Sequence, residues 1–389
     1  MNFDEIETDE GDCLEFLRVC FIDIFDTLIA KVVLVIAFVN VIGLTLLQTY
    51  YSMYYLDAVH FLKYAPVYFG RFYLMVSISF ILFYKNILYK YFQKVPKWKL
   101  DAVSKQDKSK IAKEALYVTL FCCLAIIVGV STGVLYLIPS EEDHEIFFIM
   151  TWFEENLLEW ADILSLFHRL SFPFASFLMQ TPCIQLCYSL SHLQYQMQIF
   201  IRLVENLNTG YEDTDLDQLI FDEDHHKEIK RRLIFCIKRH TEIIVTGHNI
   251  LRAGKLFVFL FVISGGLLGT SMLMFIFFLQ ALPTFTYIRL ATLIFVAALT
   301  FVRYIIQGQR TEDIGNELYA VLCSSKWYYW NKQNKQMYFI FLMNSSTPFK
   351  LKFSDKVSVC YSLGVDIMKA IYSMSSLMAY FRDSILKRN

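Results

Sequence analysis

The sequence has 389 residues, of which 56% are hydrophobic and 17% aromatic, and its mean hydropathy is +0.42. Soluble domains are roughly 45–50% apolar, so the composition excludes an ordinary soluble protein and indicates a polytopic membrane protein. The net charge of −1 is too balanced for a nucleic-acid-binding protein. None of the nine cysteines has zinc-ligand spacing, so we expect no metal, no cofactor and no disulfide framework.

The first ten residues are acidic and lack the basic segment and short apolar core of a cleavable signal peptide. We therefore expect the first apolar stretch to direct membrane insertion by itself. Seven stretches approach the roughly 20 mostly apolar residues that cross a bilayer. These stretches predict an all-α protein with seven transmembrane helices, at residues 32–53, 66–84, 115–138, 171–201, 256–280, 288–307 and 357–381.

Lysine and arginine are concentrated in alternate connections. The connections after the second, fourth and sixth stretches are strongly basic, whereas those after the first, third and fifth contain only Lys63, Arg169 and Arg289. Short basic loops stay in the cytosol, so the N-terminus is predicted to be cytosolic and the C-terminus extracellular. A G-protein-coupled receptor has the opposite orientation. The sequon at Asn344 should then be cytosolic and unmodified, which makes its glycosylation a test of topology.

The seventh stretch carries a polar stripe at helical spacing. Its members are Ser358, Ser362, Asp366, Lys369, Ser373, Ser376 and Tyr380. Polar groups at membrane depth face other helices or water. One interpretation is a seam packed on neighbouring helices, with Asp366 and Lys369 paired. The other is the border of an aqueous ion pathway that Leu377 and Phe381 could close by dewetting.

Four segments in the last third of the chain resemble insect odorant receptors. They are residues 315–318 (GNEL), 323–328 (CSSKWY), 341–351 (FLMNSSTPFKL) and 362–373 (SLGVDIMKAIYS). The resemblance implies a ligand-gated, non-selective cation channel in the cell membrane of olfactory sensory neurons. It also implies a heterotetramer with a common co-receptor. The connection between the fourth and fifth stretches lacks the co-receptor's extra length, so the chain resembles an odour-tuning subunit.

The resemblance also divides the chain. It implies a cytosolic N-terminal segment at 1–31, six membrane helices with an outer ligand pocket at 32–307, and a cytosolic anchor segment at 308–356. Residues 357–389 would form the pore-lining helix and a short extracellular tail. By position, the pore and gate residues are Ser373, Ser376, Leu377, Tyr380 and Phe381. Tyr380 and Phe381 are bulkier than in the co-receptor.

A pocket for small volatile ligands needs apolar walls with a few polar contacts. The predicted outer halves of the second, third, fourth and sixth stretches are rich in such residues, although many aromatic side chains must instead face lipid or pack in the core. The candidates are Phe69, Phe72, Tyr73, Ser131, Thr132, Tyr136, Phe174, Phe177, Met179, Tyr287 and Thr292.

Other functions have weaker support. Asp213 and Asp215 begin like a calcium loop, but Gln218 stands where the loop needs glycine. The adjacent His225 and His226 point in different directions on a helix, so they predict cytosolic surface instead of a metal site. No enzyme motif occurs in a fitting context. The alternatives are a gustatory receptor of the same architecture, or a seven-span transporter, which would need repeats or broken helices that the sequence lacks.

Overall fold

The computed structural model describes residues 12–56, 58–84, 104–140, 143–211, 216–278, 284–352 and 357–386. These residues form helices and turns, with one isolated β-bridge between Lys352 and Ser358 and no strand. The all-α prediction is therefore confirmed. The helices are α1 Glu15–Phe21, η1 Asp23–Asp26, α2 Leu28–Tyr54, α3 Ala58–Ser79, η2 Phe80–Tyr84, α5 Lys105–Leu135, α6 Asp143–Ile146, α7 Phe148–Asn156, α8 Ala161–Glu205, η4 Asn206–Asn208, α9 Leu216–Phe221, α10 Glu223–Phe278, α11 Thr284–Ser324, η5 Trp327–Tyr329, α12 Lys332–Ser345 and α13 Tyr361–Leu386.

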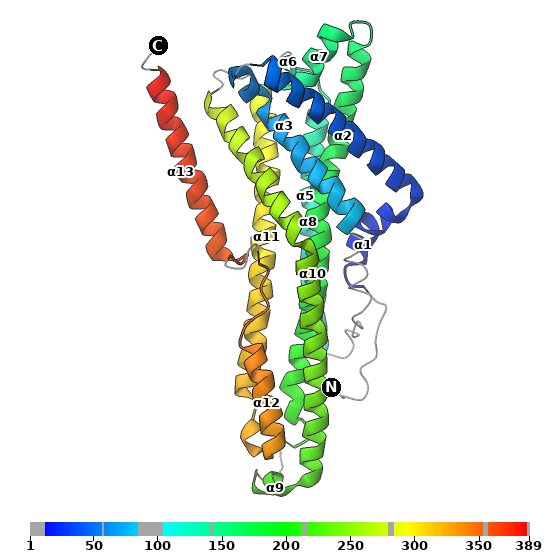
Figure 1. Ribbon diagram of the computed structural model, residues 1–389. Coiled ribbons are helices and arrows are strands. Elements are labelled where there is room, and N and C mark those ends of the chain that lie inside the picture. Colours follow the sequence, from blue (N-terminus) through cyan, green and yellow to red (C-terminus); the bar gives the residue numbers. More distant parts are fainter. Residues whose placement is uncertain are drawn as a thin grey trace.

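Three long helices, α8, α10 and α11, run side by side along the molecule (Figure 1). The short helices α6 and α7 lie at one end of these rods, and α9 and α12 lie at the other. The α6–α7 end holds the acidic connection that the sequence places outside the cell. The α9–α12 end holds two of the basic connections. We call these the outer end and the inner end.

Five described helices are long and apolar enough to cross a membrane. They correspond to the first, second, third, fifth and sixth predicted stretches. The segments are Leu28–Tyr54, Phe61–Tyr84, Lys105–Leu135, Gly254–Phe277 and Thr284–Ser324. α10 and α11 continue as helices well past the apolar stretches, so the predicted boundary between residues 307 and 308 lies inside a continuous helix.

α8 is the central helix of the bundle and contacts α1, α3, α5, α10 and α11. Every residue from Gln180 to Tyr195 is buried. This helix contains the fourth predicted stretch, yet its composition is too polar for it to be counted among the five. Because protein instead of lipid surrounds this part of α8, its surface need not be apolar.

The polar residues of α8 bond to its neighbours. Gln194 Nε2 donates to Thr311 Oγ1 at 2.8 Å and to the Gln307 carbonyl oxygen at 3.1 Å. Gln307 Nε2 donates in return to Gln194 Oε1 and Ser191 Oγ, both at 3.1 Å. A buried amide costs little when its hydrogen bonds are made, so these contacts join α8 to α11 in a fixed register.

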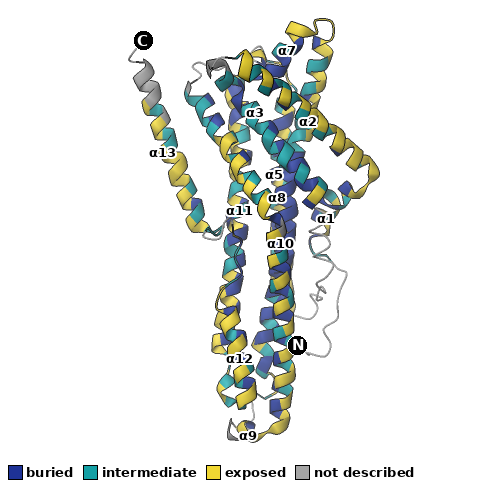
Figure 2. Cartoon of the chain, viewed as in Figure 1, coloured by how far each residue is buried: buried dark blue, intermediate teal, exposed yellow. Residues whose placement is uncertain are grey.

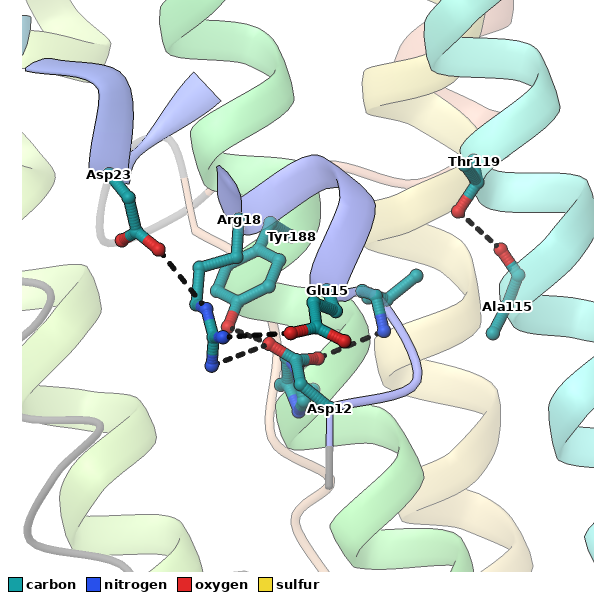
Figure 3. Close-up of polar contacts among 9 residues, drawn as sticks. Asp12, Glu15, Arg18, Asp23, Ala115, Thr119 and Tyr188 are labelled. Carbon is teal, nitrogen blue, oxygen red and sulfur yellow. Dashed lines mark hydrogen bonds and ion pairs between the residues drawn. The ribbon is translucent and has the colours of Figure 1, made fainter. Parts of the chain in front are cut away.

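The segment before α2 docks on α8. Leu17 and Phe21 are buried, and Gln185 Nε2 donates to the Phe21 carbonyl oxygen at 2.6 Å. Asp12 lies beside α8, with Oδ1 2.6 Å from His192 Nε2 and Oδ2 accepting from the Tyr188 hydroxyl at 2.7 Å (Figure 3).

Burial by itself would raise the pKa of Asp12. The hydrogen bond and charge of His192, together with the Tyr188 hydroxyl, outweigh burial and lower that pKa well below its usual value. Arg18 adds an ion pair at 3.5 Å and also reaches Glu15 and Asp23 (Figure 3). The N-terminal segment is therefore fixed to the central helix.

α13 stands apart from the bundle (Figures 1 and 2). The Tyr361 backbone N–H donates to Gln309 Oε1 at 3.1 Å, and Gly364 lies over Ile305 of α11. Among the described residues of α13, Gly364 alone is buried. A Cβ atom on Gly308 would overlap the Val359 carbonyl oxygen, so this glycine permits the chain leading into α13 to lie against α11.

Candidate functional site: the outer aromatic cluster and the last helix

Three aromatic rings meet at the outer end, where α5, α7 and α8 converge. The ring of Tyr136 lies 5.4 Å from that of Phe172 and 5.9 Å from that of Phe147, and the latter two are 5.1 Å apart. Their packing continues into an apolar cluster with Met272 and Phe275 of α10. Such walls suit an apolar ligand. We call these three rings the outer aromatic cluster.

A buried ionic group borders this cluster. Arg289 of α11 is 1% exposed, and its guanidinium lies 5.0 Å from the ring centre of Tyr136. Its Nη1 donates to Asp143 Oδ1 at 2.6 Å, and it also donates to the carbonyl oxygens of Leu135 and Ile138. Arg169 donates to the other Asp143 oxygen. Asp143 of α6 thus ties α8 to α11 through the two arginines, and Arg289 extends the link to the end of α5.

Sequence reasoning missed the structural role of Arg289 and Asp143, because it counted them only as charges of outer connections. One signal was available. A single arginine beside an apolar stretch predicts a buried anionic partner or a functional site. The identity of that partner could not be derived, because Asp143 lies 146 positions away in the sequence.

The candidates on α3 lie among aromatic rings of their own helix and of α10. The rings of Phe69 and Phe72 are 6.4 Å apart, and Tyr68 stacks edge-on against both. Tyr73 points instead toward Phe261 of α10, with ring centres 5.3 Å apart. Phe69, Phe72 and Tyr73 stand at positions i, i+3 and i+4 of the helix, so they lie on one side of α3, and Tyr73 extends that side to α10.

The polar candidates bond mainly within their own helices. The Thr132 hydroxyl donates to the Val128 carbonyl oxygen at 2.9 Å, and that of Thr292 donates to the Arg289 carbonyl oxygen at 2.8 Å. Thr132 is buried and Ser131 is exposed. Tyr287 is also exposed.

Three candidates on α8 lie elsewhere. Phe174 is exposed, and Met179 packs beside α2 and α3. Phe177 lies 5.8 Å from Phe21 and 6.2 Å from Phe25, so it contacts the N-terminal segment. Of the eleven predicted ligand residues, the structure thus places Tyr136 in the outer aromatic cluster, and the Thr292 hydroxyl bonds to the backbone of Arg289 one turn earlier in α11.

A cavity of about 30 Å³ lies at the inner end, between α8, α10, α11 and the chain after α12. Its walls include Gln194, His240, Ser345 and Phe349. This volume holds about two waters and is too small for an odorant. Burial lowers the pKa of His240 to about 4, so the ring is neutral near pH 7. The cavity is separate from the predicted ligand pocket.

The described pore candidates are exposed to solvent on α13. Ser373, Ser376, Leu377 and Tyr380 are all exposed. The Phe381 side chain lies outside the described residues. Asp366 and Lys369 are exposed too, and no ion pair joins them in the part of α13 that the structure describes. In the isolated chain, the polar stripe is therefore not a seam packed on neighbouring helices.

These features define a helical membrane protein built around one buried central helix. The family model described as "7tm Odorant receptor" matches residues 59–372. The chain therefore belongs to this odorant receptor family, whose members are receptors and not enzymes.

Two solved structures share the fold. The insect olfactory receptor OR5 from Machilis hrabei aligns with a TM-score of 0.65 at 11% identity, covering 94% of this chain and 90% of that one. The same receptor in complex with eugenol aligns with a TM-score of 0.61 at 11% identity, covering 90% and 88%. A comparison with curated proteins finds no match.

Proposed function

We propose that this chain is an odour-tuning subunit of a ligand-gated, non-selective cation channel. It detects small volatile organic molecules and assembles with the odorant receptor co-receptor as a heterotetramer. It resides in the dendritic membrane of olfactory sensory neurons, crosses the membrane seven times, and has a cytosolic N-terminus.

The exposure of α13 carries the channel proposal. This helix presents Asp366 and Lys369 together with large apolar residues such as Met368 and Leu377, and little of it contacts the rest of the chain. A membrane helix with exposed ionisable groups needs water or partner helices around it. Symmetric association of several subunits would supply both, with polar stripes around a shared aqueous path and Leu377 in a gate.

The outer aromatic cluster supports ligand detection. Its rings lie at the predicted outer end, bordered by the fixed guanidinium of Arg289. One of the similar structures is a complex with eugenol, a small molecule. We extend that ligand class, small volatile molecules, to this chain.

The inner end supports a further part of the proposal, that residues 308–356 form a cytosolic anchor segment. α8, α10, α11 and α12 form one continuous core there, which includes Trp330, Tyr338 and Phe341. A rigid inner core can hold subunits together while the outer end responds to ligand.

Recording currents tests the proposal. In cells that contain the chain and a co-receptor, we expect a volatile panel to evoke cation currents that neither subunit gives at the same ligand concentrations alone. Replacement of permeant cations should abolish them. Odour responses that persist without ion flow through the complex, and that G-protein inhibition blocks, would contradict the channel.

Glycosylation tests the orientation separately. Leu158→Thr creates a sequon at Asn156 in the predicted outer connection, and Leu158 is 83% exposed, so the change should be tolerated. We expect glycan at Asn156 in this variant and none at Asn344. The reverse pattern would overturn the orientation.

A further inference from the structure

Arg71 of α3 is a buried cation without an anionic partner. It is 6% exposed, and its Nη1 donates to Gln48 Oε1 of α2 at 2.7 Å. Its Nη2 has no hydrogen-bond partner among the described residues, and no described carboxylate forms an ion pair with it. Burial of an unpaired charge costs several kcal/mol, so the site favours an anion.

Other unpaired donors surround the same region. Gln48 Nε2 and Trp152 Nε1 are buried and lack partners among the described residues, and both groups can only donate. Ser52 Oγ, one turn after Gln48 on α2, and His168 Nε2 on α8 also lack partners there. Arg71, Gln48 and Trp152 therefore each lack an acceptor, and the Ser52 hydroxyl and the His168 imidazole can also donate to one.

Contacts place these groups near one another at the outer end. The Trp152 ring lies 6.4 Å from the ring of Tyr51, which is next to Ser52 in α2. The His168 ring lies 5.2 Å from the ring of Phe172 at the same end, and its pKa is lowered by burial first and then by the nearby charges of Arg71 and Arg169. Helices α2, α3, α7 and α8 thus contribute to one site.

The protein's own buried carboxylate is already used. Asp143 is fully buried and is bonded by both Arg169 and Arg289, which leaves it no ion pair with Arg71 among the described contacts. Among the described residues at the outer end, three buried arginines (Arg71, Arg169 and Arg289) stand against one buried aspartate, an excess of two positive charges.

Apolar rings lie beside the unpaired donors. Phe148 packs 5.4 Å from Tyr51 and 5.7 Å from Tyr64, measured between ring centres. A ligand with an anionic head and a short hydrocarbon tail matches donors next to such rings.

We propose that Arg71, with Gln48 and His168, recognises the carboxylate of a small organic acid. This inference rests on the proposed function as an odorant receptor and narrows its ligand class. Arg71 supplies the charge, Gln48 orients the guanidinium through its oxygen, and the free amide and imidazole groups contact the second carboxylate oxygen.

A binding measurement tests the site without channel activity. Purified receptor would be heated with hexanoate, hexan-1-ol or chloride at equal concentrations. We expect hexanoate to raise the melting temperature of the natural protein, and hexan-1-ol and chloride to have little effect. Arg71→Met should abolish the hexanoate shift, and Arg71→Lys should retain part of it. Arg71→Met removes an unpaired buried charge, so it should fold.

Arg202→Met is the matched control, because Arg202 is a partly exposed inner-end residue whose ion pairs include Asp107 and Glu205. It should leave the hexanoate shift unchanged. Stabilisation by chloride alone, equal stabilisation by hexan-1-ol, or a hexanoate shift that survives in Arg71→Met would each overturn the assignment.

Currents with the co-receptor give the second readout. Arg71→Met should raise the half-maximal hexanoate concentration at least about tenfold, with the response to hexan-1-ol unchanged. Hexanoate binding through Arg71 without any current would support this site and refute the channel. Currents evoked by other volatiles, with no binding of hexanoate, would refute this site and leave the channel standing.

Discussion

α8 and α13 are both too polar to be counted among the apolar spanning helices, and they are polar for opposite reasons. In α8, the polar groups Gln185, His192 and Gln194 are buried and bonded to other elements. In α13, the polar stripe is exposed along its described length. A polar membrane helix can thus be either the centre of a bundle or a surface that needs further partners. Composition alone does not distinguish a buried polar helix from an exposed one. Substitutions do, because they should lower the free energy of unfolding much more in α8 and its contacts than in α13.

The largest expected effect is at Asp12. Asp12→Ala removes the carboxylate that His192, Tyr188 and Arg18 share, and breaking such a buried pair should lower the free energy of unfolding by about 3 kcal/mol. Thermal or denaturant unfolding of the purified protein measures it. Glu15→Ala is the control, because Glu15 is exposed and pairs with the same Arg18. Equal losses in both variants would show that the buried contacts of α8 do not matter.

Gln307→Leu should cost about 2 kcal/mol, because it removes the amide bonded to Gln194 and Ser191 inside the bundle. The exposed Gln333 of α12 gives the control substitution Gln333→Leu. Denaturant midpoints of the two variants measure the difference. A stable Gln307→Leu protein would mean that α8 tolerates an apolar neighbour there.

Glu228 at the inner end is a polar group that water reaches, so its contribution to the free energy of unfolding should be smaller than that of the buried groups. Hydrogen bonds from Arg231, and then from Arg232, lower its pKa to about 2. Because the folded pKa lies below the unfolded value near 4.5, the stabilisation is present above about pH 4.5 and is lost as the pH falls toward 2. Glu228→Gln should cost about 1 kcal/mol at pH 7 and flatten the pH dependence of unfolding in that range.

The smallest stability effect is expected on α13. Ser373→Ala and Ser376→Ala should change the free energy of unfolding by less than about 0.5 kcal/mol, because both side chains are exposed in the isolated chain. In assembled channels, the same variants should alter the cation current if the stripe borders the pore. A large loss of stability in the isolated subunit would show that the polar groups of α13 are packed and bonded like those of α8, which would contradict the contrast between the two helices.

Much of the fold could be predicted from the sequence, because helices that face lipid must be apolar. That requirement located all five apolar helices, although the third begins at Lys105, ten residues before its predicted start, and the sixth continues to Ser324, seventeen residues past its predicted end. It could not show that α10 begins at Glu223, because the inner part of that helix is stabilised by packing against α8 and α12. Nor could it show that the acidic outer connection folds into α6 and α7.

The candidate site was less predictable. The sequence drew attention to aromatic residues, and it found Tyr136, but it did not single out Arg71 within the second apolar stretch. The relation of Arg71 to Gln48 and His168 depends on three helices and follows no periodic pattern. Pairings of that kind become visible only when the helices are placed in space.

α11 is one continuous helix that connects the outer end of the molecule to the chain leading into α13. Arg289, fixed to Asp143 at the outer end, and Gly308, against the chain that leads into α13, belong to the same unbroken helix. The nineteen-residue separation corresponds to about 28 Å at roughly 1.5 Å per residue. A tilt of about 5° pivoting at Arg289 would therefore displace Gly308 by about 2.5 Å, given that rise per residue. A small angular change at the outer end thus becomes, beside the chain that leads into α13, a displacement larger than a carbon–carbon bond.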